Sequence, residues 1–439
     1  MNRLVIEKLI KWKNNPEKQP LLIRGARQIG KTYVVREFAK KYFKNYIEIN
    51  FERDRWVKGI FYDDLSPKRI LSEIEIGYHK SISDLNDTLI FFDEIQECKE
   101  AITSLKYFSE EIASINLIAA GSLLGVSLIR NEVSFPVGKV DSINMFPINF
   151  EEYLLATNNE RLRDLIFEKF KTFSPLDEVL HNVAIKEYRK FLALGGMPRP
   201  LQIYIDTNSY LKADSILKNI FLDYLDDMEK YTSTNESIKI KNCYNSIPKQ
   251  LGKENKNFKY SEIQKGKDKK YFGNSIHWLT NSNVVLRVNN TETPRVPLEF
   301  HKDENNFRIY MADHGMLRSK AKIPIENIIQ VDYVDDMIGM LVENYVACEF
   351  ASKNIPLYFW RGKKQYEIEF LIEENNNVIP VEVKNSKRVI SKSLCSFLEQ
   401  YNSPYAYRIS MKNFRYENKI KSVPLYAVWC IKHSSYGKR

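Results

Sequence analysis

Residues 25–32 of this 439-residue chain read GARQIGKT, which fits the pattern G-x-x-x-x-G-K-[ST]. Two glycines at this spacing allow a turn tight enough for backbone N–H groups to converge on an anion. An apolar run at residues 20–24 precedes the turn, and Val34, Val35 and Phe38 follow it at helical spacing. The segment therefore predicts a phosphate-binding loop between a buried strand and a helix.

Such a loop predicts ATP and Mg²⁺ as ligands. We expect the phosphates to be held by the whole loop, that is by Gly25, Ala26, Arg27, Gln28, Ile29, Gly30, Lys31 and Thr32. Lys31 reaches the outer phosphates in this arrangement, and the Thr32 hydroxyl ligates the metal ion. The positive end of the helix that starts here favours bound anions further.

A second apolar run, at residues 88–92, ends in two acids, Asp93 and Glu94. The carboxyl ends of parallel strands face the nucleotide in such folds, so Asp93 is expected to hold Mg²⁺ and Glu94 to polarise the attacking water. Further strand candidates lie at residues 46–51 and 116–120. The alternation of strands and helices predicts a parallel sheet with right-handed crossovers.

Composition indicates a soluble cytoplasmic protein with real cores, since 44% of its residues are hydrophobic. Its five cysteines are far apart and none has C-x-x-C spacing, which argues against zinc and favours a reducing compartment. No apolar run is long enough to span a membrane, so no membrane partner is expected. The net charge of +10 is compatible with an anionic partner such as DNA.

Several short words along the chain carry a family resemblance. They are residues 24–32, 92–97 (FDEIQE), 120–122 (AGS), 135–139 (FPVGK), 145–153 (MFPINFEEY), 194–198 (LGGMP), 343–347 (ENYVA), 367–371 (EIEFL) and 382–384 (EVK). On these words the chain resembles bacterial and archaeal AAA-type ATPases whose C-terminal domain of unknown function is similar to PD-(D/E)xK nucleases. The resemblance implies an additional-strand P-loop ATPase, with Ser122 at the polar sensor position and Glu94 as water activator.

The arginine finger is left open. Members of this family often have Gly-Arg where this chain has Gly138 and Lys139, and Arg130 is an alternative. A lysine lacks the bidentate fork of an arginine. A finger that reaches a neighbouring subunit would require an oligomer, which the sequence neither predicts nor excludes.

We expect an α/β fold in four parts. These are a P-loop AAA-type core with a parallel sheet at 1–150, a helical lid at 151–230, a winged-helix-like module at 231–325 and a restriction-endonuclease-like α/β domain at 326–439. Asn149 with a glutamate three residues later predicts the first helix of the lid. Glycine and proline at residues 195–198 predict a break between its helices.

The third part contains short helix candidates followed by strand candidates at residues 284–288 and 307–311, a pattern typical of winged helices. Residues 239–270 hold ten lysines and three acids, which suits contacts with DNA phosphates. The alternative is a set of solvated lysines on a packing module. Arginine is scarce here, which argues against reading of base sequence.

Two alternating segments, residues 366–372 and 378–384, flank an EENNN turn and predict a β-hairpin. A turn centred between Asn375 and Asn376 places Glu369 opposite Glu382. Two opposed carboxylates repel each other unless a cation lies between them, which suits Mg²⁺.

With Lys384, and with Glu343 on the preceding helix, these residues match the spacing of the PD-(D/E)xK site. Glu369 stands where that family has aspartate, and its extra methylene displaces the carboxylate from octahedral geometry. The alternative is a degenerate site in which Glu367 and Lys384 form only a cross-strand ion pair. We therefore expect weak or absent cleavage.

Three hypotheses for function follow. The first is a Mg²⁺-dependent ATPase whose nucleotide state is coupled to the C-terminal parts, with DNA as a candidate partner. The second is an ATP-dependent DNA nuclease, and Glu369 argues against it. The third is a non-catalytic nucleotide switch that docks a protein partner, and the presence of Glu94 argues against it.

Overall fold

The structure, a computed structural model, describes residues 1–439 except 83, 123–135, 331–335, 363–365, 386–391 and 434–439. The chain forms two compact units, each with its own sheet. The first contains residues 2–146 and 281–283, and the second contains Met1 and residues 147–280 and 284–439. In the described part of the chain, no helix is both long and apolar enough to cross a membrane.

The first unit is built on a five-stranded parallel sheet of order β2-β3-β4-β1-β5. Its strands are β1 (Leu21–Arg24), β2 (Asn45–Asn50), β3 (Thr88–Asp93), β4 (Leu117–Gly121) and β5 (Asp141–Asn144). Strands β3 and β4 are buried throughout, which explains their uninterrupted apolar sequences. Because β4 lies between β1 and β3, the topology is the additional-strand arrangement that the family resemblance implied.

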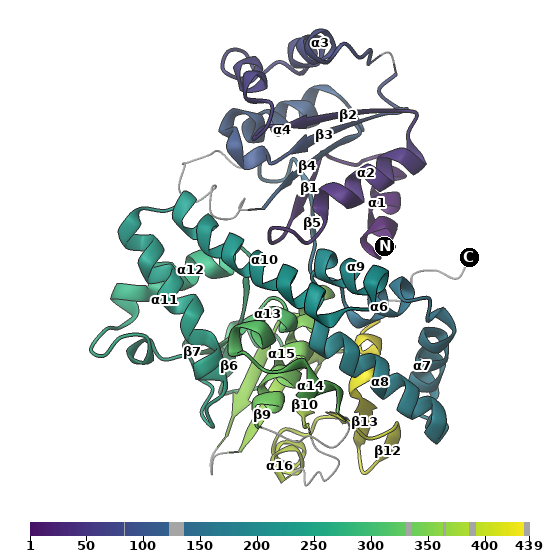
Figure 1. Cartoon of the computed structure of the whole chain (residues 1–439), viewed down its shortest axis with the longest axis vertical. Coiled ribbons are helices and arrows are strands. Elements are labelled where there is room, and N and C mark those ends of the chain that lie inside the picture. Colours follow the sequence, from purple (N-terminus) through teal and green to yellow (C-terminus); the bar gives the residue numbers. More distant parts are fainter. Residues whose placement is uncertain (83, 123–135, 331–335, 363–365, 386–391, 434–439) are drawn as a thin grey trace. The chain divides into compact units, whose positions relative to one another are not determined.

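Helices cover both faces of this sheet, with α1 and α2 on one side and α4 on the other (Figure 1). The helices are α1 (Val5–Lys13), α2 (Lys31–Tyr42), α3 (Pro67–Tyr78) and α4 (Lys99–Glu111), with 3₁₀ turns η1 (Arg55–Phe61) and η2 (Ile95–Glu97). Phe51, Phe61 and Phe92 pack edge to face in the core, with ring centroids 5.4–5.7 Å apart. This core fixes the carboxyl ends of β2 and β3, where the polar residues of the site lie.

The second unit begins with a run of helices: α6 (Phe150–Ala156), α7 (Glu160–Thr172), α8 (Glu178–Leu194), α9 (Pro198–Thr207), α10 (Tyr210–Lys230) and α11 (Thr234–Leu251). The expected start is confirmed, since the Asn149 side chain accepts from the Glu152 N–H at 2.9 Å and the Glu152 carboxylate accepts from the Asn149 N–H. The expected break is confirmed between α8 and α9. Gly195 there has a φ of 82°, and a β-carbon on it would lie 2.7 Å from the Gly315 Cα.

The remaining helices of this unit are α12 (Lys269–Asn281), α13 (His314–Ala321), α14 (Ile325–Ile329), α15 (Asp336–Ser352) and α16 (Lys392–Tyr401), with 3₁₀ turns η3 (Tyr260–Glu262), η4 (Leu298–His301) and η6 (Leu425–Cys430). They accompany an eight-stranded mixed sheet of order β12-β13-β11-β10-β9-β8-β6-β7. Its strands are β6 (Val285–Thr291), β7 (Lys302–Met311), β8 (Tyr358–Arg361), β9 (Glu367–Glu374), β10 (Asn377–Val383), β11 (Ala406–Ser410), β12 (Arg415–Glu417) and β13 (Ile420–Pro424).

The β6–β7 ribbon continues this sheet. Strand β6 pairs in parallel with β8 through Asn289↔Tyr358 and Asn290↔Phe359, so the expected boundary at residue 325 falls between strands of one sheet. Local sequence pattern predicts a ribbon but not its partner strand, and this pairing was not expected. The division of the unit into lid, winged-helix-like and nuclease-like parts stays a prediction.

The β9–β10 hairpin has the expected register. Its pairs run from Asn377↔Glu374 to Val381↔Phe370. Asn375 and Asn376 form the turn with φ values of 49° and 60°, the pair of positive angles that a two-residue type I′ turn requires. The hairpin prediction is thus confirmed down to its turn.

Candidate functional site

The loop at residues 25–32 connects β1 to α2 and adopts backbone angles that favour glycine at two positions. Gly25 and Gly30 have φ values of 147° and 91°. A β-carbon on Gly25 would lie 2.3 Å from the Met145 carbonyl oxygen, so a larger residue would displace the loop. The glycine spacing therefore reflects both turn geometry and close backbone packing.

Lys31 is buried at the first position of α2. Its ammonium donates to the carbonyl oxygens of Gly25 at 3.0 Å and Ala26 at 2.7 Å. Burial lowers the pKa of Lys31 to about 8, although the nearby carboxylates of Glu94 and Asp93 oppose this change. The side chain is thus folded back onto its own loop, from which it can exchange carbonyl oxygens for phosphate oxygens.

Thr32, Asp93 and Asn50 meet at the carboxyl ends of β2 and β3. The Thr32 hydroxyl donates to the Asp93 carboxylate at 3.1 Å, and the Asn50 amide donates to it at 3.1 Å. Burial and the adjacent Glu94 carboxylate raise the pKa of Asp93 to about 6. A hydroxyl and a buried carboxylate side by side are the ligands that a P-loop Mg²⁺ requires, so the residues present fit that ion.

Glu94 and Ser122 also lie together at this edge. Glu94 directly follows β3 with a φ of 51°, an uncommon angle for a residue with a β-carbon. Its carboxylate accepts hydrogen bonds from the Gln96 amide at 2.6 Å and from the Ser122 hydroxyl at 3.5 Å. The structure thus brings together the residues that the sequence assigned to catalysis and to the metal.

Three contributors to this site were missed in the sequence. Buried Arg3 donates to the carbonyl oxygens of Ile29 at 2.8 Å and Phe146 at 2.7 Å, and so fixes the loop from the N-terminus. No local pattern marks Arg3. Asn50 could have been found, because it is a polar residue that ends a strand next to Asp93; Gln96 lies within the acidic motif itself.

Of the two arginine-finger candidates, Lys139 and Arg130, the structure describes only Lys139. The Lys139 ammonium lies 3.2 Å from the Glu110 carboxylate within the same unit. Arg130 lies outside the described residues. The source of a finger therefore stays open.

The four residues of the predicted nuclease-like site converge in the second unit. Glu369 on β9 accepts from the Val383 N–H at 3.0 Å, and Lys384 lies 3.3 Å from Glu369 and 3.7 Å from Glu382. The Glu343 carboxylate on α15 is close enough to influence the pKa values of Glu369 and Lys384. The cross-strand pair of the alternative reading is not observed, since the Glu367 carboxylate lies 2.5 Å from the Arg308 guanidinium instead of pairing with Lys384.

This cluster does not fit a divalent metal ion. Glu343 is paired with Lys256 and, at 3.4 Å, with Arg308, and it accepts a hydrogen bond from the Tyr310 hydroxyl. Among the described residues, no group of three or more His, Cys, Asp or Glu side chains is arranged to hold a metal. The carboxylates already form ion pairs with lysine and arginine side chains of the same chain.

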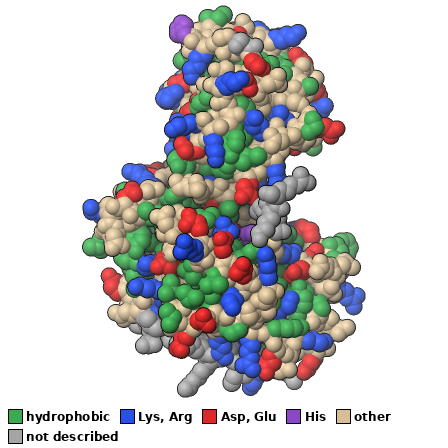
Figure 2. All heavy atoms as spheres, turned by 90° about the vertical axis from the view of Figure 1, so that its right-hand side faces the viewer, with side chains coloured by type: hydrophobic (Ala, Val, Ile, Leu, Met, Phe, Trp, Pro, Cys, Tyr) green, Lys and Arg blue, Asp and Glu red, His purple; other side chains and the backbone are tan. Residues whose placement is uncertain are grey.

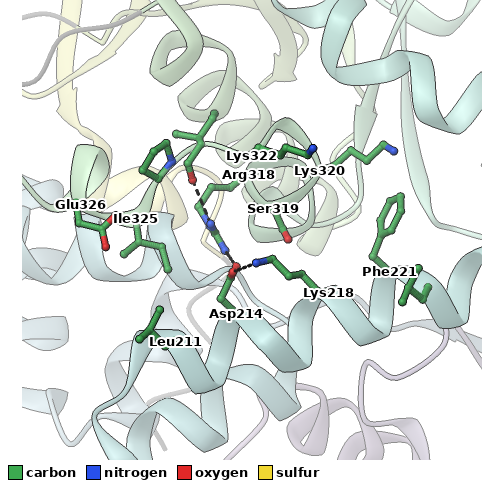
Figure 3. A pocket seen from close by; sticks show the side chains of 13 residues that line it. Leu211, Asp214, Lys218, Phe221, Arg318, Ser319, Lys320, Lys322, Ile325 and Glu326 are labelled. Atoms are coloured by element: carbon green, nitrogen blue, oxygen red, sulfur yellow. Dashed lines mark hydrogen bonds and ion pairs between the residues drawn. The ribbon is translucent and has the colours of Figure 1, made fainter.

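A cavity of about 590 Å³ lies in the second unit between α10 and the α13–α14 region (Figure 3). Asp214 points into it and pairs with Arg318 and, at 2.8 Å, with Lys218. The rest of its lining is apolar or basic except for Ser319 and Glu326; the other residues are Leu211, Phe221, Leu222, Lys320, Lys322, Ile323, Pro324 and Ile325. None of the site residues expected from the sequence lines this cavity.

The lysines of residues 239–270 do not form one uniform basic surface. Lys241, Lys253 and Lys256 are paired with glutamates, whereas Lys269 and Lys270 are exposed. Figure 2 shows a different face, on the side away from α11 and α12 in Figure 1, where basic and acidic side chains are interspersed with hydrophobic and neutral ones. The number of lysines free to meet DNA is therefore smaller than the sequence suggests.

Comparison with protein families divides the chain into three matched regions. Residues 17–154 match an AAA domain, residues 185–326 a domain of unknown function (DUF8612) and residues 338–428 another (DUF4143). The first match covers the loop, β3 and Ser122, so the chain carries an AAA-type P-loop domain at its N-terminal side. The other two descriptions carry no function, and the nuclease-like likeness stays a prediction.

Solved structures with detectable similarity are distant. They include the Walker-type ATPase of Pyrococcus abyssi (14% identity over 73% of this chain and 96% of that chain, TM-score 0.44). Another is the Aeropyrum pernix ORC2 protein in ADPNP–ADP complexes (12% identity over 77% of this chain and 94% of that chain, TM-score 0.34). A third is the Aeropyrum pernix ORC1 protein in complex with DNA (11% identity over 74% of this chain and 92% of that chain, TM-score 0.28). These TM-scores are too low to support an inference about activity. No curated protein matches the chain.

Proposed function

We propose that this chain is a Mg²⁺-dependent ATPase that acts at the carboxyl edge of the five-stranded sheet. The observation that carries this proposal is the Thr32–Asp93 pair, with oxygens 3.1 Å apart, at the start of the helix that follows the glycine loop. A chance glycine turn gives no reason for a buried carboxylate from a different strand to meet that hydroxyl. The AAA match over residues 17–154 supports the same conclusion.

Each residue has a separate task in this proposal. The backbone N–H groups of the loop and the Lys31 ammonium bind the β- and γ-phosphates, while Thr32 and Asp93 hold Mg²⁺. The ion neutralises charge on the phosphate oxygens when bound. Glu94 orients and polarises the attacking water, and Ser122 and Gln96 hold the Glu94 carboxylate in place.

Two substitutions test this assignment. Lys31→Ala should abolish ATP binding, whereas Glu94→Gln should keep binding and lower the turnover rate by about 10²–10³-fold, because an amide cannot accept the proton. Thermal unfolding measures the first effect: MgATP at about a hundred times its dissociation constant stabilises a binding-competent protein by ~2.7 kcal/mol. An equal stabilisation of Lys31→Ala would refute the loop assignment, and unchanged turnover in Glu94→Gln would refute the catalytic one.

The nucleotide state is proposed to act on the C-terminal unit, with DNA as the candidate partner. The exposed lysines of residues 239–270 support a DNA contact through phosphates. The alternative of a DNA nuclease has less support, because Glu343 and Glu369 are already paired with basic side chains. Assaying ATP turnover with and without DNA, while watching for strand cleavage, separates these functions.

A further inference from the structure

Three carboxylates from three different elements meet in the interior of the second unit. Glu343 comes from α15, Glu369 from β9 and Glu382 from β10, and they are 3%, 7% and 1% exposed. Burying several carboxylates together is costly unless each is paired with a cation or a hydrogen-bond donor. The nuclease-like resemblance implies that a divalent ion supplies this charge.

The chain supplies cations of its own instead. Lys256 pairs with Glu343, and Lys384 lies within 4 Å of both Glu369 and Glu382. Arg308, which is fully buried, reaches Glu343 as well and places its guanidinium over the Phe359 ring. Four carboxylates, with Glu367 included, thus face three basic side chains.

Lys256 is the one of these cations that neither lies in a strand of the sheet nor directly follows one. It lies in the segment between α11 and η3, two residues before Phe258. The Phe258 N–H donates to the Phe307 carbonyl oxygen at 2.8 Å, and the two rings stack at 5.7 Å. Since Phe307 precedes Arg308 on β7, this anchor places Lys256 beside the carboxylates independently of the ion pair itself.

We propose that Lys256 is a built-in cation that closes this carboxylate cluster to divalent metal ions and ties the basic segment to the sheet. The pairing agrees with the arrangement of the described residues here, which include no group of three or more His, Cys, Asp or Glu side chains placed to hold a metal. It also removes Lys256 from the lysines that could meet DNA. The cluster is then an internal ion-pair lock, from which we expect weak or absent DNA cleavage.

Burial and neighbouring charges agree with this lock. Burial would raise the pKa of Glu343, but Lys256 and Arg308 outweigh it and hold that pKa below its usual value. Burial raises the pKa of Glu369; the Lys384 ammonium opposes this rise, and the Glu343 carboxylate adds to it. The four carboxylates exceed the three basic side chains by one charge, and without Lys256 the excess would be two negative charges, which a divalent cation could neutralise.

The test is a MnCl₂ titration followed by thermal unfolding of the full chain, without nucleotide. All variants carry Asp93→Asn, which removes the carboxylate ligand of the metal ion proposed for the nucleotide site. With Lys256 present we expect Mn²⁺ to leave the unfolding midpoint unchanged. With Lys256→Met added we expect a Mn²⁺-dependent rise of about 2 °C or more, and Glu369→Gln should abolish that rise.

The matched control is Lys253→Met, on the same segment. Lys253 pairs with Glu262, away from the cluster, and should gain no response to Mn²⁺. If Lys256→Met fails to fold, as judged by circular dichroism, Lys256→Gln replaces it. A folded variant without any gain would overturn the proposal. The proposal would also be overturned if Mn²⁺ raised the unfolding midpoint of the chain with Lys256 intact and Glu369→Gln abolished that rise. This second outcome can be measured without any Lys256 variant.

Discussion

At the scale of single residues, the nucleotide site combines charge with burial in a way that costs stability. Asp93 is 3% exposed and has Glu94 beside it, so its pKa rises from 3.8 to about 6. A carboxyl whose pKa is raised by folding stabilises the fold only while it is protonated. That contribution is complete below about pH 4 and is lost as the pH rises through 6.

Asp93→Asn should therefore stabilise the nucleotide-free protein at pH 7.5 while abolishing Mg²⁺-dependent ATP binding. The asparagine removes the buried charge and can still accept from Thr32. Two pKa units correspond to on the order of 2–3 kcal/mol. The free energy of unfolding, measured between pH 5 and 8, should show an advantage that shrinks toward pH 5.

The matched control is Asp63→Asn, at an exposed aspartate of the same unit. This change should leave the free energy of unfolding unchanged at each pH. In the natural chain, stabilisation by MgATP should weaken as the pH falls through 6, because protonated Asp93 is a poor metal ligand. A nucleotide-free Asp93→Asn protein that is less stable at pH 7.5 would contradict this account.

At the scale of elements, two hairpins depend on turns with a left-handed backbone. Asn375 and Asn376 join β9 to β10, and Asn418 and Lys419 join β12 to β13 with φ values of 50° and 61°. Asparagine tolerates such angles, whereas lysine has no local hydrogen bond to compensate them. The sequence predicted the first turn from its asparagines and missed the second.

Lys419→Gly should therefore stabilise the protein by about 0.5–1 kcal/mol, and Asn376→Gly by less. Both side chains are exposed, so backbone strain dominates each change. Asn376→Val should cost about 1–2 kcal/mol, because a β-branched residue resists positive φ. Urea denaturation measures all three.

Asn377→Gly, at the first residue of β10, is the control and should be destabilising, since glycine weakens a strand. If Lys419→Gly were also destabilising, the strain assigned to that turn would be wrong.

At the scale of the whole molecule, the net charge of +10 makes an electrostatic DNA contact the natural test of partner choice. We expect any DNA binding to lie mainly in residues 239–270 and to be largely indifferent to sequence. Each neutralised phosphate should add about −0.9 to the slope of log affinity against log salt on duplex DNA.

Reversing the exposed pair Lys269 and Lys270 to glutamate should weaken DNA binding and flatten the salt slope, and adding reversals of Lys265 and Lys267 should extend both effects. The control reverses Lys40 and Lys41, an exposed pair on α2, with the same change in net charge. Fluorescence anisotropy of labelled duplex DNA over a range of salt concentrations measures the affinity and the salt slope of both variants. Equal losses would show a general charge effect, and absence of binding at low salt would exclude this role.

Sequence pattern alone was enough to predict the glycine loop, the acidic strand end, the capped helix at Asn149 and the β9–β10 register. Each is encoded within a few neighbouring residues, where backbone geometry and side-chain chemistry suffice. The three-dimensional packing was needed to show that Arg3 fixes the loop, that β6 joins β8, and that Lys256 meets Glu343. Those contacts join residues far apart in the chain, and burial supplies the energy that selects them. Local pattern therefore indicated which carboxylates would meet, while long-range packing decided which cation they hold.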